Sequence, residues 1–355
     1  MRNSSRNIYA NLMSYWLEYN TYIKELDVLF IAGDLYHRLL SKNSSDAIIA
    51  TEWLMFILKV SAKNNTRVRV LEGTPSHDFN QVRHTDSIVN AISLDNLDFK
   101  YIENITIENI DGYDILYVPD EVNHDSKDTE KEIDELLRDR GIDKVDIAIM
   151  HGSFNYQIPM VELKSSHNEA YFLNKVRYNI SIGHVHTFSI YSRIIAQGSF
   201  DRLAHGEEEK KGGVFFHVDK SRNESSYIFL ENKKAMVFDT LKLKAKSIKE
   251  SINEFSKFIK SRPLNSAIRV VLTNSNIHLK DDIYLLTKKH PAYYITIKIE
   301  DDKDSVDKKR TLLEIPEQIS ITKDNIRGLL MEEIQFSSIE PTIGRYIMVE
   351  LDKIL

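Results

Sequence analysis

The fold is decided by the stretch Val28-Leu-Phe-Ile-Ala-Gly-Asp-Leu-Tyr-His37, in which an apolar run leads directly into a glycine and polar side chains. A short β-rich run that ends at small or polar residues predicts a buried strand followed by a turn. Gly33 permits a tight turn, so Asp34 and His37 would lie just beyond the end of the strand. Similar apolar runs recur at residues 68–71, 115–118, 147–150 and 180–182.

Helical patterns lie between these predicted strands. Apolar residues at helical spacing and N-capping residues mark two segments: residues 45–62, with Ser44 or Ser45 as N-cap, and residues 129–140, with Asp128 or Thr129 as N-cap. Strands that alternate with helices predict an α/β domain. After Ile194 the pattern changes to strands at residues 213–218 and 226–230, which we expect to form a hairpin that closes this domain.

The remainder of the chain predicts a second, smaller domain. Helices are expected at residues 247–261 and 280–289 and strands at residues 267–272 and 293–299, which together describe a small α+β module. We therefore divide the chain into a first domain of residues 1–240, an α+β domain of residues 241–310 and a C-terminal segment of residues 311–355. Within that segment, residues 322–333 form an amphipathic helix that either docks a partner or packs on its own domain.

Composition excludes several kinds of chemistry. The 355 residues include no cysteine, which excludes disulfides, thiolate nucleophiles and Cys-ligated metal sites. Neither a signal peptide nor a membrane-spanning apolar run is recognisable, so a cytoplasmic protein is expected, in the host cytoplasm if a phage encodes it. The net charge of −6 argues against a broadly basic, nucleic-acid-coating surface. Any chemistry must come from His, Asp and Glu.

Polar side chains of metal-binding type follow four of the predicted strands. They are Asp34 and His37, then His77 and Asp78, then His151, and finally His184 and His186. A lone histidine at a strand end is more often a surface or hydrogen-bonded residue than a ligand, but the coincidence at four strands reverses that preference. The strand ends therefore predict a metal site at one edge of the sheet.

The ligand types indicate which metal and which reaction this site would serve. His184 and His186 are separated by one residue, so on an extended segment both imidazoles lean to one side and can serve adjacent metals. Imidazoles combined with a carboxylate favour Mn²⁺, with Fe²⁺ or Zn²⁺ as alternatives, over Mg²⁺. Two such ions can activate water and neutralise a phosphoryl group. The pattern therefore favours phosphoester hydrolysis with two divalent ions.

The order of these motifs resembles the calcineurin-like metallophosphoesterases: Gly-Asp34, Gly73 with His77-Asp78, His151-Gly, then Gly-His184-Val-His. Within that superfamily, the segments 33–37 and Gly198-Ser-Phe-Asp-Arg-Leu-Ala-His-Gly-Glu207 resemble the SbcD-type DNA-repair nucleases, including phage-like members. The resemblance covers residues 1–235 and implies a sandwich of two β-sheets flanked by helices. The second domain matches the family's DNA-facing capping domain by position and size only.

The resemblance also implies roles for individual residues. Asp34 would bridge both metals, His151 and His184 would bind one ion, and His186 would bind the other. An Asn normally precedes the motif-three histidine as a metal ligand in this family, and here Ser76 stands in that place, a weaker neutral ligand.

The catalytic group implied by the resemblance lies in the same motif. His77, paired with Asp78, would be the acid or transition-state residue at the scissile phosphate, because a carboxylate gives an imidazole a defined tautomer and a raised pKa. His37 would lie beside it, supporting the ligands or contacting the phosphate.

The family's first motif, Asp-x-His, does not occur before Asp34. Three explanations compete. Either the start is assigned too late or the gene is split, or the chain is a shortened one, or the chain has lost catalysis. The retained ligands favour the first two explanations over the third. Without that motif, one metal would keep only Asp34 and His186 as protein ligands.

The leading functional prediction is a Mn²⁺-dependent exo/endonuclease for double-stranded DNA ends or hairpins. The resemblance implies an SbcC-like coiled-coil ATPase as partner and a homodimer. The alternatives are a phosphodiesterase or phosphatase for a small substrate and a non-catalytic subunit that binds DNA or a partner.

Overall fold

The computed structural model describes residues 4–300, except 42, 80, 84–88, 90–93, 121–124, 158–165, 245 and 246. Residues 1–300 form one compact unit. The helix predicted at residues 322–333 and the boundary predicted at 310/311 lie outside the described residues. None of the helices in the described part of the chain is long and apolar enough to cross a bilayer.

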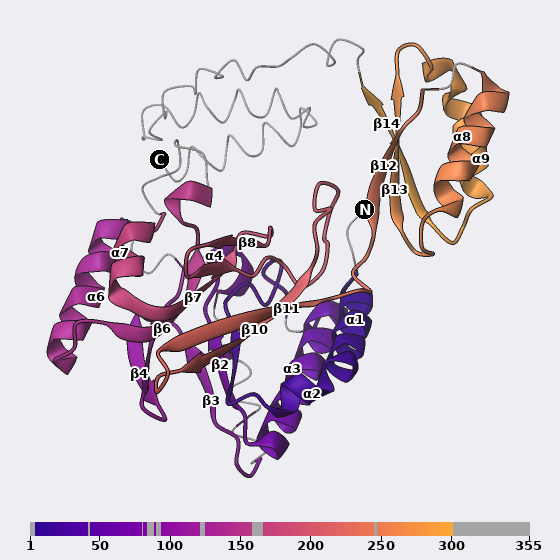
Figure 1. Cartoon of the computed structure of the whole chain (residues 1–355). Helices are drawn as coiled ribbons and strands as arrows, with labels where there is room; N and C mark the ends of the chain where they lie inside the picture. The colour runs from indigo at the N-terminus through magenta and orange to yellow at the C-terminus, as the bar shows by residue number, and fades with distance from the viewer. Residues whose placement is uncertain are drawn as a thin grey trace, which may run out of the picture. The chain divides into compact units, whose positions relative to one another are not determined.

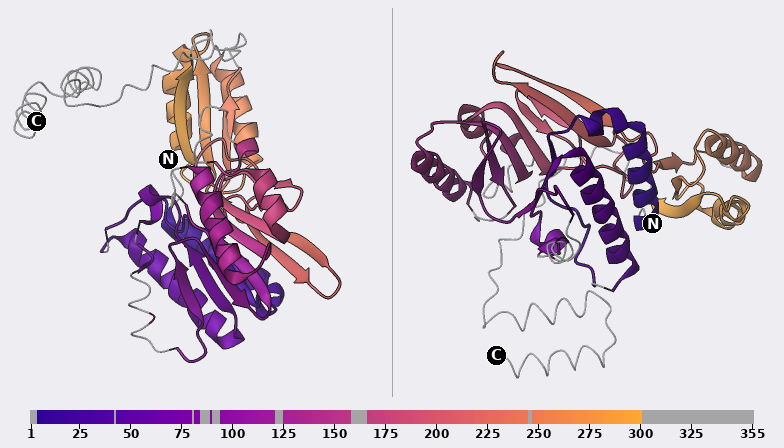
Figure 2. Two further views of the ribbon diagram at one scale, coloured as in Figure 1. Left: turned by 90° about the vertical axis from the view of Figure 1, so that its left-hand side faces the viewer. Right: turned by 90° about the horizontal axis from the view of Figure 1, so that it is seen from below.

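The N-terminal part builds a parallel three-stranded sheet with helices beside it (Figure 1). Its elements are α1 (Ser5–Glu18), α2 (Asn20–Lys24), β1 (Val28–Ile31), α3 (Ser45–Asn64), β2 (Arg67–Leu71), α4 (Pro75–Asp78) and β3 (Phe99–Ile102). The strand order is β1-β2-β3. Figure 2 shows α1 and α3 side by side along this part.

A mixed six-stranded sheet follows, in the order β4-β5-β6-β7-β9-β8. Its elements are β4 (Thr106–Ile110), β5 (Tyr113–Val118), α6 (Ser126–Arg140), β6 (Val145–Gly152), the 3₁₀ helix η1 (Asn155–Gln157), α7 (Glu169–Lys175), β7 (Val176–His184), β8 (Ser189–Tyr191) and β9 (Ile194–Ala196). β5, β6, β7 and β9 are parallel, and the edge strands β4 and β8 are antiparallel to their neighbours. The carboxyl ends of the parallel strands therefore meet at one edge.

The side chains of β5 alternate between two apolar clusters, one toward the other sheet and one toward the helices. Ile115 and Tyr117 belong to an apolar cluster shared with Ala32 and Leu71 of the first sheet, whereas Leu116 and Val118 pack in the cluster that holds α6 and α7. Successive side chains on a strand face opposite sides, so one face meets the other sheet and the other face meets helices. The α/β class is thus confirmed, and the layering is compatible with the predicted two-sheet sandwich.

The chain continues with the predicted hairpin and a small parallel sheet. The elements are β10 (Gly212–Asp219), β11 (Glu224–Glu231), β12 (Phe238–Lys242), α8 (Ile248–Lys260), β13 (Ala267–Thr273), the 3₁₀ helix η3 (Ile277–Leu279), α9 (Lys280–Lys288) and β14 (Tyr294–Glu300). Sheet order is β12-β13-β14, all parallel. Because β12 begins at Phe238, one strand of this sheet spans the boundary predicted at 240/241.

Local capping explains where the helices begin. The Ser44 hydroxyl accepts a hydrogen bond from the Ala47 amide (3.2 Å), as expected for the N-cap of α3. The predicted start of α6 was wrong: the helix begins at Ser126, and the Asp125 side chain caps it by accepting from the Lys127 amide (2.9 Å). An Asp three residues upstream of the predicted cap supplies an equally good acceptor, and the helix extends to it.

Candidate metal centre

Four chain segments converge where β1, β2, β6 and β7 end, and glycines allow the close approach. A Cβ on Gly33 would come within 2.3 Å of His151 Nδ1, and one on Gly183 within 2.1 Å of the Ala32 carbonyl oxygen. Real Cβ atoms do not approach neighbours so closely, so only glycine fits at either position. The turn after β1 is thereby held against β6 and β7.

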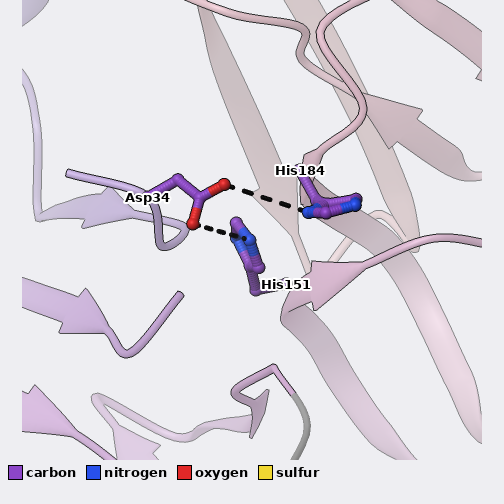
Figure 3. A group of neighbouring side chains, drawn as sticks. All are labelled: Asp34, His151 and His184. Carbon is purple, nitrogen blue, oxygen red and sulfur yellow. Dashed lines mark ion pairs between the residues drawn. The ribbon is translucent and has the colours of Figure 1, made fainter. Parts of the chain in front are cut away.

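Among the described residues, Asp34, His151 and His184 form a group that could hold a metal ion, called the metal-binding group below, with one ligand atom from each within 4.8 Å of the others. His151 Nε2 lies 3.3 Å from Asp34 Oδ1, and His184 Nδ1 lies 3.9 Å from Asp34 Oδ2. Figure 3 shows the Asp34 carboxylate with one oxygen toward each imidazole. One carboxylate and two imidazoles are a donor set that suits Mn²⁺, Fe²⁺ or Zn²⁺.

Backbone geometry presents these ligands to a common point. Asp34 has φ +51° and His184 has φ +93°, both in the left-handed region that non-glycine residues seldom occupy. Strain of this kind costs about 1–3 kcal/mol per residue and clusters at functional sites. The two strained residues of this edge are both members of the metal-binding group.

The tautomer of His151 is set by the backbone. His151 is buried, and its Nδ1 donates to the Ala32 carbonyl oxygen at 2.6 Å. With Nδ1 donating to the backbone, Nε2 is the atom that faces Asp34. Burial opposes protonation of His151, but the hydrogen bond and charge of Asp34 outweigh it and raise the His151 pKa, so a metal ion bound at Nε2 would take the place of a proton.

The electrostatics of the group favour an ionised carboxylate. Burial opposes ionisation of Asp34, but the hydrogen bond and charge of His151 outweigh it and hold the carboxyl pKa well below its usual range. Burial lowers the pKa of His184, and the positive charge of His151 lowers it further. His184 is therefore biased toward the neutral imidazole, the form that coordinates metals.

Asp78 holds the turn after β1, a role that differs from its predicted pairing with His77. The carboxylate is buried and accepts hydrogen bonds from the amides of Gly73 (3.1 Å), Leu35 (3.2 Å) and Tyr36 (3.0 Å). Burial, followed by the nearby negative charge of Asp34, raises the pKa of Asp78 to about 6. Asp78 thus fixes the backbone directly after Asp34.

His77 instead contacts the metal-binding carboxylate directly. Its Nδ1 lies 3.1 Å from Asp34 Oδ2. The exposed His37 ring lies near it, with ring centroids 5.6 Å apart. The two histidines predicted to act at the phosphate are therefore neighbours, and His77 is adjacent to the metal-binding group.

Two predicted metal ligands stand outside the three-residue group. Ser76 is exposed, and Thr74, two residues earlier, places its hydroxyl 3.5 Å from Asp34 Oδ2 and 3.2 Å from His184 Nδ1. His186 Nδ1 pairs with Glu207 Oε1 at 3.1 Å. The hydroxyl nearest the group is that of a different residue because Pro75 starts the short helix α4, which carries Ser76 to the surface.

The segment that follows β9 braces the His186 loop. Lys211 is almost completely buried, and its Nζ donates to the His186 carbonyl oxygen at 2.9 Å while lying 3.5 Å from Glu207 Oε2. The Leu203 amide donates to Glu207 Oε2 at 3.1 Å. Burial opposes ionisation of Glu207, but the hydrogen bond with His186 outweighs it and lowers the carboxyl pKa. These contacts explain the dense charge of residues 207–211.

Sequence reasoning missed Thr74, Asp120 and the His186–Glu207 pair. Asp120 follows β5 as Asp34 follows β1, so its position after a predicted strand was a usable signal. Thr74 and Glu207 gave no comparable signal, because their roles depend on turns that only the folded chain defines. No protein-family model and no curated protein matches this chain.

Proposed function

We propose that the chain is a divalent-metal-dependent phosphodiesterase whose substrate is DNA. The observation that carries the proposal is the convergence of Asp34, His151 and His184 at the strand ends, with His77 bonded to the same carboxylate. A carboxylate and two imidazoles that can hold a divalent ion, beside an imidazole that can move a proton, are the arrangement that phosphoester hydrolysis requires.

A divalent ion held by Asp34, His151 and His184 would act as a Lewis acid and lower the pKa of a bound water. His77 would donate a proton to the leaving oxygen, and its Nδ1 contact with Asp34 orients the ring for that transfer. His37 would meet the phosphate from the exposed side.

A second ion, with Mn²⁺ proposed for both, would take His186. Glu207 holds His186 Nδ1, which leaves Nε2 as the ligand atom, as carboxylate–histidine pairs do in metal sites. The resemblance of residues 1–235 to SbcD-type nucleases is the basis for three further proposals. The substrates are DNA ends and hairpins, the partner is a coiled-coil ATPase, and the chain forms a homodimer.

The test is Mn²⁺-dependent degradation of linear duplex DNA, with His77→Ala as the control for contaminating nuclease. Activity that the wild type shows and His77→Ala loses is the expected result. Faster hydrolysis of bis(p-nitrophenyl) phosphate than of DNA would favour a small-substrate phosphodiesterase. Absence of both activities in a protein that binds Mn²⁺ would favour the non-catalytic subunit.

A further inference from the structure

The hydroxyl of Thr74 lies at the centre of four metal-ligand side chains. Its Oγ1 is 3.0 Å from Asp120 Oδ2, 3.2 Å from His184 Nδ1, 3.4 Å from His151 Nε2 and 3.5 Å from Asp34 Oδ2. Three of these side chains are the metal-binding group, and the nearest of the four is Asp120. One oxygen atom thus marks a point that all four donors face.

A hydroxyl cannot satisfy that environment. It carries a single proton, so it can donate to only one of the two carboxylates around it. The other carboxylate then faces an oxygen lone pair at 3.0 to 3.5 Å, which is unfavourable. A cation at the same point would be attracted to both carboxylates and both imidazoles at once.

We propose that Asp120 is the fourth protein ligand of the metal ion bound by Asp34, His151 and His184. The proposal rests on the proposed metal binding at this site and extends it by one residue. Two carboxylates and two neutral imidazoles balance the charge of a divalent ion and supply four protein ligands, as a tight site needs.

The position of Asp120 fits this role. It follows β5, the neighbour of β6 that carries His151, and its backbone amide donates to the Glu72 carbonyl oxygen (3.4 Å) beside the loop that carries Thr74. Its side chain is 14% exposed, and Asp120 Oδ2 lies 3.9 Å from His151 Nε2. Asp120 is therefore anchored by its backbone while its carboxylate faces the group.

Only a small movement of the Asp120 side chain is needed to bring its carboxylate to the point that the other three ligands face. Donor atoms of Asp34, His151 and His184 already lie within 4.8 Å of one another. Rotation about the Asp120 side-chain bonds would bring its Oδ2 to the shared point as the Thr74 hydroxyl moves aside. The backbone need not move, because both residues are held by main-chain hydrogen bonds: the Thr74 amide donates to Asp34 Oδ1 at 2.8 Å.

The first experiment measures Mn²⁺ binding by calorimetry for the wild type, Asp120→Asn and Asp114→Asn. Asp114 lies on the same strand, β5, but its carboxylate accepts from Asn109 (2.9 Å) away from the group, so its variant controls for loss of one negative charge. We expect Asp120→Asn to weaken Mn²⁺ binding by about tenfold or more and Asp114→Asn to leave it unchanged. Equal affinity in all three proteins would overturn the proposal.

Melting in EDTA separates a ligand from a structural residue. Removing a carboxylate that faces Asp34 relieves repulsion in the metal-free protein, so Asp120→Asn should melt at the wild-type temperature or above it. A lower melting temperature in EDTA would mean that Asp120 serves the fold instead, and would also overturn the proposal.

A direct readout uses the absence of cysteine from the chain. Asp120→Cys introduces the sole thiol, and Co²⁺ coordinated by that thiolate should give a ligand-to-metal charge-transfer band. Asp114→Cys should give none. A band in neither variant would overturn the role of position 120.

The two proposals fail in different ways. If the wild type binds Mn²⁺, Asp34→Asn abolishes binding and Asp120→Asn does not, the metal site stands and Asp120 is not its ligand. If the wild type binds no Mn²⁺, the metal-dependent function itself is wrong, and the fourth ligand is wrong with it.

Discussion

Two polar clusters lie in the same pair of sheets, and their carboxylates have opposite kinds of partner. Around Arg69, the guanidinium donates to both oxygens of Glu108 (2.8 and 2.9 Å) and lies 2.9 Å from Asp98 Oδ1. Around Asp34, one carboxylate is shared by imidazoles at 3.1 to 3.9 Å. The first cluster contains its own permanent cation, and the second does not.

This difference shows how a structural ion cluster can be told from a candidate metal site. Arg69 is 1% exposed, its forked donors match the Glu108 carboxylate, and a guanidinium remains charged at every relevant pH. Asp34 stands in a strained backbone conformation beside histidines whose charge depends on pH. The Arg69 cluster is complete without a ligand, whereas the Asp34 cluster is the one that we propose a cation from solution completes.

The largest effect should come from Asp34→Asn, which removes the carboxylate that all three histidines contact. We expect Mn²⁺-dependent hydrolysis of DNA to fall by at least about 10³-fold, or ~4 kcal/mol of transition-state stabilisation. Stability in EDTA should fall, because the lowered pKa of the Asp34 carboxyl means that, despite burial, its ionised form is stabilised by His151 and the Thr74 amide in the folded chain. Rate measurements at saturating Mn²⁺ test the loss of hydrolysis, and unfolding in EDTA tests the change in stability.

A matched variant for this change is Asp146→Asn, on β6, the strand that also carries His151. Asp146 is buried but bonded to Lys220 (2.8 Å) and Arg177 (3.0 Å), so it already has cations as partners. Its variant should lose stability and keep hydrolysis. If Asp146→Asn instead lowered hydrolysis as much as Asp34→Asn, the distinction between the two kinds of cluster would be lost.

The next largest effect should come from Arg69→Met, which removes both guanidinium hydrogen bonds to Glu108 and leaves Lys100 as its remaining cation. Breaking a buried pair costs about 3–5 kcal/mol of unfolding free energy, and the remaining Lys100 contact puts the expected loss at about 3 kcal/mol, the lower end of that range. Arg67→Met is the control: Arg67 lies on the same strand, is 29% exposed and pairs with Asp98 and Asp111, and its loss should cost about 1 kcal/mol or less. Urea unfolding compares the two, and equal losses would contradict a structural role for burial at position 69.

Strand ends were the part of the site that could be predicted from sequence. Asp34, His151 and His184 each follow a run of apolar residues, and parallel strands bring such ends together whatever the details of the loops. The alternation of strands and helices followed from the same runs, whereas the arrangement in two sheets was expected only from the family resemblance. Short strands such as β3 and β4 were missed, because residues 99–110 mix apolar side chains with Lys, Glu and Asn.

Contacts between turns could not be predicted, because they depend on backbone conformations that no residue pattern specifies. Asp78 was expected to pair with its neighbour His77, but the tight turn after β1 presents three amides to its carboxylate instead. Thr74 enters the site because the chain turns at Pro75 into α4. Each error concerns the direction of a side chain within a correctly located loop.

A third prediction concerns the response of each cluster to metal. At Mn²⁺ concentrations about 100 times the Kd, binding should stabilise the wild type by ~2.7 kcal/mol. Arg69→Met should show the same increment, since distant and independent effects add, and Asp34→Asn should show none. Thermal melting with and without Mn²⁺ measures this, and a smaller increment in Arg69→Met would mean that the two clusters are coupled.

The smallest effect expected is the pH dependence of stability that Glu108 of the Arg69 cluster contributes. Burial opposes ionisation of Glu108, but hydrogen bonds from Arg69 and Lys100 outweigh it and lower the carboxyl pKa from 4.5 to about 2. A carboxyl whose pKa is lower in the folded state contributes stability above its unfolded pKa and loses it as pH falls toward the folded value. We expect about 2 kcal/mol to be lost between pH 4.5 and pH 2. Urea unfolding of the wild type and Glu108→Gln in EDTA isolates this contribution, because the variant lacks the titrating group and should show the shallower slope. Equal slopes would mean that Glu108 titrates alike in the folded and unfolded chain, and the guanidinium would then not be the cation that completes its cluster.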